Sequence, residues 1–170
     1  MKLKILLLLI TAYIHASGQN AYTGLILQTR LQGTYNFNES DSVRYYLVEL
    51  ELKNASDSSI GFTCYSCTTI ANIVLDIKSV TICTKLCPEN YLNSIELKPN
   101  QVFFIPIVLR VSDINVVMNQ SLSIGFIWVN EPNQSRFTKA IQDKKKSQQD
   151  IIWSDPISLQ ISGNSYTIKQ

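Results

Sequence analysis

Tyr45-Tyr46-Leu47-Val48-Glu49-Leu50-Glu51-Leu52-Lys53-Asn54 is the stretch of sequence that decides the fold. Every second residue from Tyr46 to Leu52 is apolar, whereas the carboxylates of Glu49 and Glu51 lie between them. Successive side chains of an extended strand point to opposite faces, so this pattern predicts one buried face and one charged, solvated face. The stretch therefore predicts a half-buried strand of an antiparallel sheet.

Alternating or continuous apolar runs recur along the chain, and no stretch shows a 3.6-residue apolar repeat with helix caps. The further predicted strands are residues 71–78, 102–111, 121–129 and 157–161, with weaker ones at 25–31, 59–64, 91–97 and 165–169. Seven to nine short strands at this spacing predict an all-β fold, a two-sheet antiparallel β-sandwich. The predicted core consists of Val48, Leu50, Leu52, Ile105, Ile107, Leu109, Ile124, Phe126, Leu159 and Ile161.

Two prolines refine this prediction. In Lys98-Pro99-Asn100-Gln101 the proline occupies the second position of an expected type I turn between two strands. Pro106 lies inside the apolar run 102–111 and cannot donate to a strand ladder, which predicts a sheet edge or a bulge at that point.

Two polar segments do not fit regular strands. Gln32 to Ser42 is rich in asparagine and serine, and Asn130 to Asp150 is a polar stretch between two apolar strands. We expect the second segment to be a solvated extension or a partner-binding loop, with one short polar helix at most within Phe137–Gln149. Its three lysines, 144–146, are too few to predict nucleic-acid binding.

The chain resembles small secreted immunoglobulin-like modules in two pieces. The first is Tyr46-Leu47-Val48-Glu49-Leu50-Glu51-Leu52-Lys53-Asn54-Ala55-Ser56, a strand that ends in an Asn-x-Ser turn, and the second is Leu97-Lys98-Pro99-Asn100-Gln101. The resemblance spans about Tyr45 to Ile161, lacks the antibody-type Cys…Trp…Cys core, and implies an immunoglobulin-like sandwich without implying a function.

The first residues have the composition of a secretory signal peptide. Lys2 and Lys4 precede an apolar run from Ile5 to Ile14, and small residues then lead to expected cleavage before Gln19. A run of this length spans only about 15 Å as a helix, too short for a membrane anchor. We therefore expect a leader at 1–18, a β-sandwich domain at 19–170 without an integral membrane segment, and a secreted or periplasmic location.

The four cysteines form two close pairs, Cys64 with Cys67 and Cys83 with Cys87. In an exported protein an even set predicts two disulfides, and we favour bridges between the two pairs over local ones. A four-thiolate zinc site and a redox pair at Cys64 and Cys67 are the alternatives, so the favoured prediction contains no metal.

Charge and composition exclude several classes of function. Beyond Gly18 the chain carries 13 basic and 13 acidic residues, so bulk electrostatics predict no nucleic-acid partner. The single histidine, His15, lies in the expected leader, which leaves no Ser-His-Asp triad and no Cys-His pair. We therefore expect no enzymatic activity and no cofactor.

Aromatic residues are the candidates for partner binding. Phe62, Tyr65 and Tyr91 lie near the cysteines and are expected to be exposed. Trp153, in a separate segment, is open between core packing and binding, whereas Trp128 shares a face with apolar neighbours and is expected in the core. The sequence thus favours an exported module that binds an unknown protein or glycan partner or joins a surface assembly. An inhibitor, a small secreted enzyme and a purely structural subunit are the alternatives.

Asn-x-Ser patterns, which are the acceptor pattern for N-glycosylation, begin at Asn38, Asn54, Asn119 and Asn133.

Overall fold

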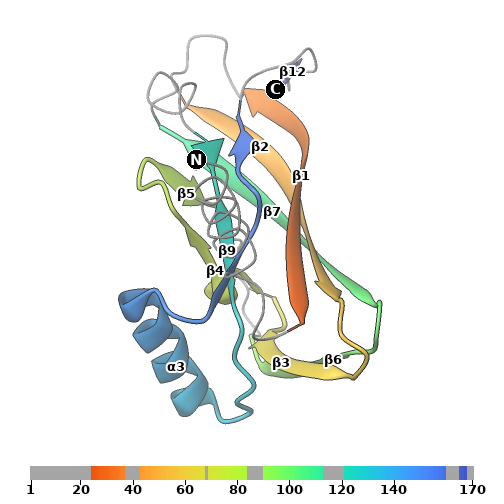
Figure 1. Cartoon of the computed structure of the whole chain (residues 1–170). Coiled ribbons are helices and arrows are strands. Elements are labelled where there is room, and N and C mark those ends of the chain that lie inside the picture. Colours follow the sequence, from red (N-terminus) through yellow and green to blue (C-terminus); the bar gives the residue numbers. More distant parts are fainter. Residues whose placement is uncertain are drawn as a thin grey trace, which may run out of the picture.

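A twisted five-stranded sheet is the largest element of the protein. The computed structural model describes residues 24–36, 43–67, 69–83, 90–112, 121–159 and 165–167. In spatial order the strands are β12 (Ser165–Thr167), β1 (Leu25–Asn36), β2 (Arg44–Asn54), β7 (Val102–Val111) and β5 (Val80–Ile82). All neighbours in this sheet are antiparallel except β12, which runs parallel to β1 (Figure 1). The prediction of a mainly β chain with antiparallel sheets is confirmed.

Shorter elements lie against one face of this sheet. A three-stranded sheet has the order β10 (Ile151–Trp153), β9 (Ile124–Ile127) and β4 (Ile73–Leu75). Two strand pairs accompany it, β3 (Ile60–Tyr65) with β6 (Leu92–Leu97) and β8 (Ser121–Leu122) with β11 (Ile157–Ser158). A 3-10 turn, η1 (Thr69–Asn72), precedes β4, and one α-helix, α3 (Gln134–Ser147), connects β9 to β10.

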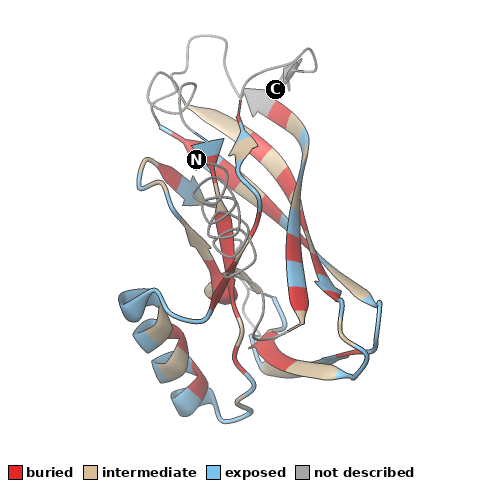
Figure 2. Ribbon diagram, in the orientation of Figure 1, coloured by how far each residue is buried: buried red, intermediate tan, exposed pale blue. Residues whose placement is uncertain are grey.

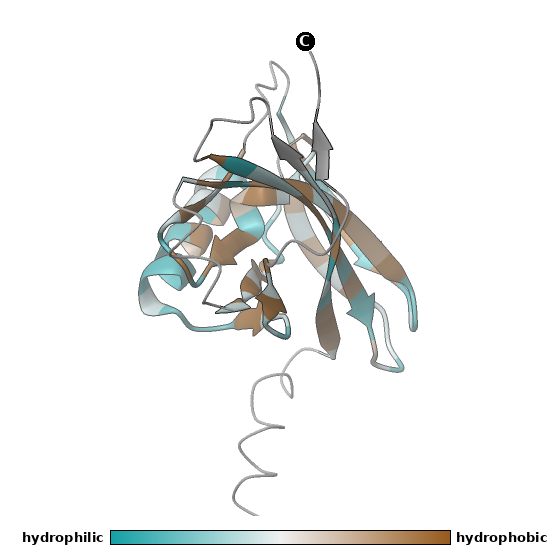
Figure 3. Ribbon diagram, turned by 90° about the horizontal axis from the view of Figure 1, so that it is seen from above, coloured by the Kyte–Doolittle hydropathy of each residue, from teal (hydrophilic) through white to brown (hydrophobic). Residues whose placement is uncertain are grey.

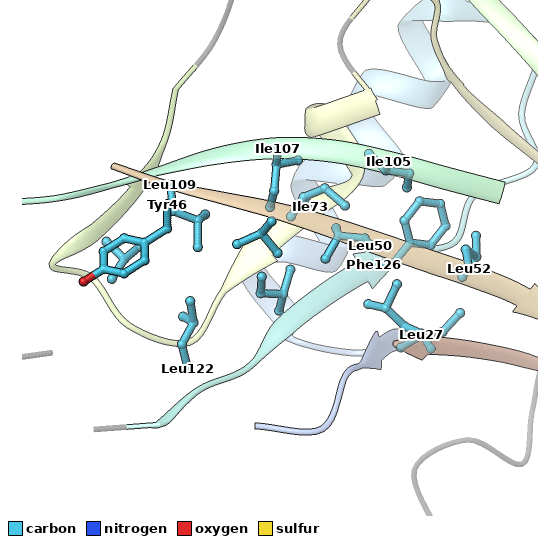
Figure 4. Packing of buried hydrophobic residues seen from close by; sticks show 14 of the residues in the cluster. Leu27, Tyr46, Leu50, Leu52, Ile73, Ile105, Ile107, Leu109, Leu122 and Phe126 are labelled. Carbon is cyan, nitrogen blue, oxygen red and sulfur yellow. The ribbon is translucent and has the colours of Figure 1, made fainter. Parts of the chain in front are cut away.

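The alternating apolar residues form the core as the sequence predicts. Nine of the ten predicted core residues are buried, and the tenth, Ile161, lies outside the described residues. Buried residues alternate with exposed or intermediate ones along β1, β2 and β7 (Figure 2). Side chains of β2 and β7, such as Leu50 and Ile105, meet Phe126 of β9 (Figure 4). Each such side chain contributes about 1.5–3 kcal/mol by leaving water.

The β9 strand is buried on both faces, as its four buried residues show. Ile124 and Phe126 belong to the main core, whereas Ile127 belongs to a second apolar cluster with Phe137 and Ile141 of α3. Helix α3 therefore covers the side of β9 that faces away from the large sheet. Trp128 packs against the main core, as predicted, and its Nε1–H donates to Gly61 O at 2.9 Å.

Pro106 lies where β7 lacks a second neighbour among the described strands. It faces Glu49 of β2, and β5 reaches only Val111 to Leu109 on the other side. Cys83 N–H donates to Val108 O at 2.8 Å, so the backbone groups of Val108 point away from β2. Backbone groups two residues apart in a strand point the same way, so those of Pro106 also point away from β2. The predicted edge position is confirmed, and the missing N–H obstructs pairing with another strand there.

Several sequence-based expectations were wrong in detail. The described chain contains twelve strands rather than seven to nine, because β4, β5, β8, β10, β11 and β12 have only two or three residues each. The polar segment after Leu31 continues β1 to Asn36 through a register shift between Leu31 and Gly33. Asn100 has φ 63°, which fits a type II turn and not the expected type I. Residues 1–23, including the expected leader, lie outside the described residues.

Candidate functional site

A hydrogen-bonded turn at the end of β3 displays the most exposed large apolar side chain of the described residues. Tyr91 is 60% exposed, and its backbone lies beside Ser66. Ser66 N–H donates to Tyr91 O at 2.8 Å, and Tyr91 N–H donates to Ser66 Oγ at 3.3 Å. Cys67 N–H donates to Asn90 Oδ1 at 3.3 Å. These bonds fix the backbone that carries Tyr91, so its ring is presented from an ordered position.

The cysteines differ from the predicted pattern of two disulfides. Cys67 is disulfide-bonded, whereas Cys64 and Cys83 have free thiols. Cys64 lies on β3 opposite Asn93 of β6, while Cys83 follows β5 beside β7, so the two thiols belong to different sheets. The expectation that all four cysteines form disulfides was therefore wrong for this pair. Cys87 lies outside the described residues.

The free thiols are not activated nucleophiles. Burial raises the pKa of the Cys64 thiol, and a hydrogen bond from Thr69 only partly offsets this effect. Burial also raises the pKa of Cys83, against the opposing charge of Arg110. Reactive cysteines need a lowered pKa. A redox pair at Cys64 and Cys67 therefore has no support in this geometry.

Tyr65 joins this turn to α3. Its ring contacts Phe137 edge to face, with centroids 5.3 Å apart, and its hydroxyl lies 3.3 Å from Thr138 Oγ1. Phe62, three residues earlier, is fully buried and contacts the rings of Phe103 and Phe126 edge to face. The prediction that Phe62 is exposed for partner binding was therefore wrong, because its side of β3 faces the main core.

Helix α3 lies within the segment Asn130 to Asp150, for which the sequence predicts a solvated extension or partner-binding loop with one short polar helix at most. Asn133 caps its first turn by accepting from Arg136 N–H at 3.1 Å, and Gln148 ends it in a left-handed conformation. Phe137 and Ile141, one turn apart, are buried and attach the helix to β9 and β10. Lysines 144–146 lie in the last turn, where positive charge interacts favourably with the helix dipole.

Lys144 is held inside this arrangement. Its Nζ donates to Trp128 O at 3.1 Å and to Asp150 Oδ2 at 3.2 Å, and lies 5.8 Å from the centre of the Trp128 ring. Its side chain is 23% exposed. Lys144 therefore fixes the end of α3 to the strand that precedes the helix.

Trp153, the last residue of β10, is half-buried and lies beside a polar hollow. A Cβ built on Gly125 would lie 2.5 Å from Ile151 Cγ2 and 3.0 Å from Cε3 of Trp153, so glycine permits this close packing. Beside Trp153 is an open hollow of about 340 Å³ that Asp76, Ser123 and Asp155 also line. Both carboxylate oxygens of Asp76 accept from Ser123 N–H at 3.0 Å, so this group already stabilises a backbone connection.

A smaller hollow of about 240 Å³ adjoins the first one at Asp155. Its wall contains the ion pair between Arg30 and Glu51, whose atoms lie 2.9 Å apart. Neither hollow joins a nucleophile to a base. Of the four residues proposed for partner binding, the structure brings Tyr65 and Tyr91 to one end of the molecule, and leaves Trp153 beside the hollows and Phe62 in the core.

The described ranges contain neither a metal-ligand cluster nor a membrane-spanning helix. No group of three or more His, Cys, Asp or Glu residues in them has a metal-binding arrangement. None of their helices has the length and apolar character that crossing a bilayer requires.

Two Asn-x-Ser patterns lie in described residues, and they differ in access. Asn54 is fully buried, and its Nδ2 donates to Ser58 O and Leu97 O at 2.7 and 2.9 Å. Asn133 is exposed at the start of α3. The first pattern is a structural turn whose amide nitrogen is already engaged.

Comparisons of the chain with protein-family models, with curated proteins and with solved structures find no match. The site must therefore be interpreted from its own geometry. Sequence reasoning allowed one short polar helix within Phe137–Gln149 but missed its start at Gln134 and its buried face. Asn133 as an N-cap and Phe137 with Ile141 at helical spacing were present as signals.

Proposed function

We propose that this chain is an exported, non-enzymatic module with an immunoglobulin-like β-sandwich core that binds a protein or glycan partner outside the cytoplasm. Its leader would be residues 1–18, and its location secreted or periplasmic. We propose as the binding surface the end of the molecule that Tyr65, Ser66, Tyr91 and α3 form, hereafter the tyrosine end. Figure 1 shows β3, β6 and α3 together at this end.

The observation that carries the proposal is the exposure of Tyr91 on a fixed turn. Tyrosine is enriched among the residues that dominate binding energy, because it offers a large apolar area and a polar group with few rotatable bonds. Hydrogen bonds between Ser66 and Tyr91, and from Cys67 N–H to Asn90 Oδ1, hold the surrounding backbone. An ordered turn loses little conformational entropy when a partner binds, which favours affinity.

The disulfide at Cys67 supports the same proposal. We infer that its partner is Cys87, because Cys64 and Cys83 have free thiols and the chain contains four cysteines. Such a bridge would close a loop of about 20 residues and constrain the turn that precedes Tyr91. Peptide mapping of the non-reduced protein should yield Cys67 and Cys87 in one linked pair, and a Cys64–Cys67 peptide would contradict the inference.

A binding experiment with a matched control tests the proposal. The purified mature chain is immobilised and exposed to the exported fraction of its source, alongside Tyr91→Ala and Phe104→Ala variants. Phe104 is 54% exposed on β7, where the outer face of the large sheet lies, so it offers an equally exposed aromatic ring elsewhere. We expect Tyr91→Ala to lose the captured partner and Phe104→Ala to keep it. Equal retention by all three proteins would contradict a binding role for the tyrosine end.

A further inference from the structure

We propose that α3 makes the tyrosine end a binding site for an anionic polysaccharide. This inference rests on the proposed function and specifies the chemistry of the partner. The starting observation is the positive charge of one helix, which is not evident from the equal numbers of basic and acidic residues beyond Gly18.

The helix concentrates positive charge on a negative body. Its 14 residues include five basic residues and one acidic residue, Asp143. Beyond Gly18 the rest of the chain carries eight basic and twelve acidic residues. The neutral part of the chain beyond Gly18 therefore separates into a helix of +4 and a remainder of −4. A field of this kind attracts anions to one end and repels them elsewhere.

The positive groups face outward because the apolar residues face inward. At about 100° per residue, Lys139 and Lys146 lie roughly opposite the buried pair Phe137 and Ile141. Both lysines are exposed. Seven residues separate them, which places them about 10 Å apart along the helix axis. Figure 3 shows α3 with hydrophilic residues alongside its few apolar ones.

Arg136 flanks this row and is exposed, whereas Lys145 projects nearer the buried pair, and burial lowers its pKa. Lys144 is already engaged with Trp128 and Asp150, so it orients the helix and leaves Arg136, Lys139 and Lys146 as the outward cations. Ser135 and Gln142, also exposed, lie next to Lys139 and Lys146 around the helix. The exposed carboxylate of Asp143 lies one turn from both lysines, so the outward face combines three cations and one anion with hydroxyl and amide groups.

That combination fits a linear polymer that carries both acidic groups and hydroxyl groups. The cations would pair with sulfate or carboxylate groups, and the amide and hydroxyl groups would bond to sugar hydroxyls. Tyr91, at the same end of the molecule, adds an aromatic ring, and such rings contribute a large apolar contact surface.

A lipid surface fits this face less well. Helices that lie on membranes bury an apolar face among the lipid chains. The apolar face of α3 is already buried against β9 and β10. Among described residues the exposed large hydrophobic side chains are Ile26, Tyr91 and Phe104, none of which belongs to α3.

The test compares defined probes with the full mature chain. Dextran sulfate is the anionic probe, and dextran of equal length is its neutral control. Binding is measured between about 50 and 200 mM salt for the wild type, for the double variant Lys139→Gln/Lys146→Gln and for Lys53→Gln/Lys98→Gln. Lys53 and Lys98 are exposed lysines on β2 and on the turn between β6 and β7, so the second variant removes the same charge elsewhere.

We expect dextran sulfate to bind and dextran not to bind. Lys139→Gln/Lys146→Gln should lower the affinity at least tenfold and reduce the slope of log affinity against log salt by about two, since two ion pairs are lost. Lys53→Gln/Lys98→Gln should stay within about twofold of the wild type. Circular dichroism checks that both variants keep the fold.

Equal losses in the two double variants would overturn the inference, because the effect would then follow net charge and not α3. Tighter binding to vesicles that contain anionic phospholipid, or to a single-stranded oligonucleotide, would overturn it as well. If the tyrosine end captures a partner that Tyr91→Ala loses, and dextran sulfate still fails to bind, the proposed function stands and this inference fails. If Tyr91→Ala changes nothing and dextran sulfate still binds through α3, the inference survives without the aromatic contact.

Discussion

The large sheet and the tyrosine end are stabilised in different ways. In β2 and β7, alternate side chains enter a continuous core, and the outward residues contribute little to it. At the tyrosine end, the helix supplies two of the five buried residues of the second cluster. A region with few apolar contacts opens more readily than the core, and binding surfaces are commonly drawn from such regions. The comparison predicts that mutations in the two regions have different consequences.

The largest effect is expected in the main core. Phe126→Ala removes a fully buried ring that contacts Phe62 edge to face at 5.4 Å, and it should lower the free energy of unfolding by about 3–5 kcal/mol. Phe104→Ala deletes the same side chain from the outer face and should stay within about 0.5 kcal/mol. Urea unfolding of both variants measures the difference. Similar losses would contradict the assignment of the two faces.

At the tyrosine end, Phe137→Ala should act locally. The substitution removes a fully buried ring from the second cluster and should cost about 3 kcal/mol, the lower end of the range for such a deletion. Since α3 is attached mainly by Phe137 and Ile141, we expect faster amide exchange in α3 and β10 and unchanged protection in β2 and β7. The exposed Gln142→Ala variant, on the opposite side of the same helix, is the control. Uniform loss of protection throughout the chain would show that the two regions unfold as one unit.

Asn54, the last residue of β2, connects the end of the large sheet to two neighbouring segments. Its side chain bonds to two carbonyl groups, Ser58 O and Leu97 O, and accepts from Ser56. Asn54→Ala leaves these buried groups without their partner and should cost about 1–3 kcal/mol in thermal unfolding. The exposed Ser59→Ala, in the same loop, should have little effect. Retained stability in Asn54→Ala would mean that water replaces the amide.

The smallest effect concerns pH. Burial raises the pKa of Cys64 above its ordinary value of 9.0, so the folded state holds its proton more tightly than the unfolded state. Stability from this group is therefore complete below about pH 9 and is lost as the pH rises through the folded pKa. Cys83 and Tyr46 act in the same direction. We expect Cys64→Ala to reduce this alkaline loss of stability in urea unfolding measured from about pH 8 to pH 11. An unchanged pH profile would contradict the burial of this thiol.

The two regions also differ in how far the sequence predicts them. The period-two pattern of β2 predicts its burial residue by residue, because a half-buried strand requires that pattern. The β10 strand, with three residues, is too short to produce it. Helix α3 is polar apart from Phe137, Ala140 and Ile141, so its sequence suggests a solvated segment. Its attachment depends on β9 and β10, which lie apart in the chain and meet only in the fold.

The candidate site residues also differ in whether the sequence alone predicts their surroundings. Tyr91 follows from its position beside the cysteines, whereas the burial of Phe62 depends on which face of β3 meets the core. Cys64 and Cys83 could not be assigned as free thiols from spacing alone, because four cysteines allow several pairings. The charge of α3 is present in the sequence, but it acquires a direction only when Phe137 and Ile141 fix the inner face.

The central claim is that partners contact the tyrosine end and not the outer face of the large sheet. Amide hydrogen exchange of the mature chain, with and without the captured partner, tests it most directly. The account predicts added protection at Ser66, Cys67, Asn90 and Tyr91 and along α3, and none at Val102–Val108 of β7. Protection confined to β7 and β2 would contradict it and would transfer the binding role to the sheet face that carries Phe104.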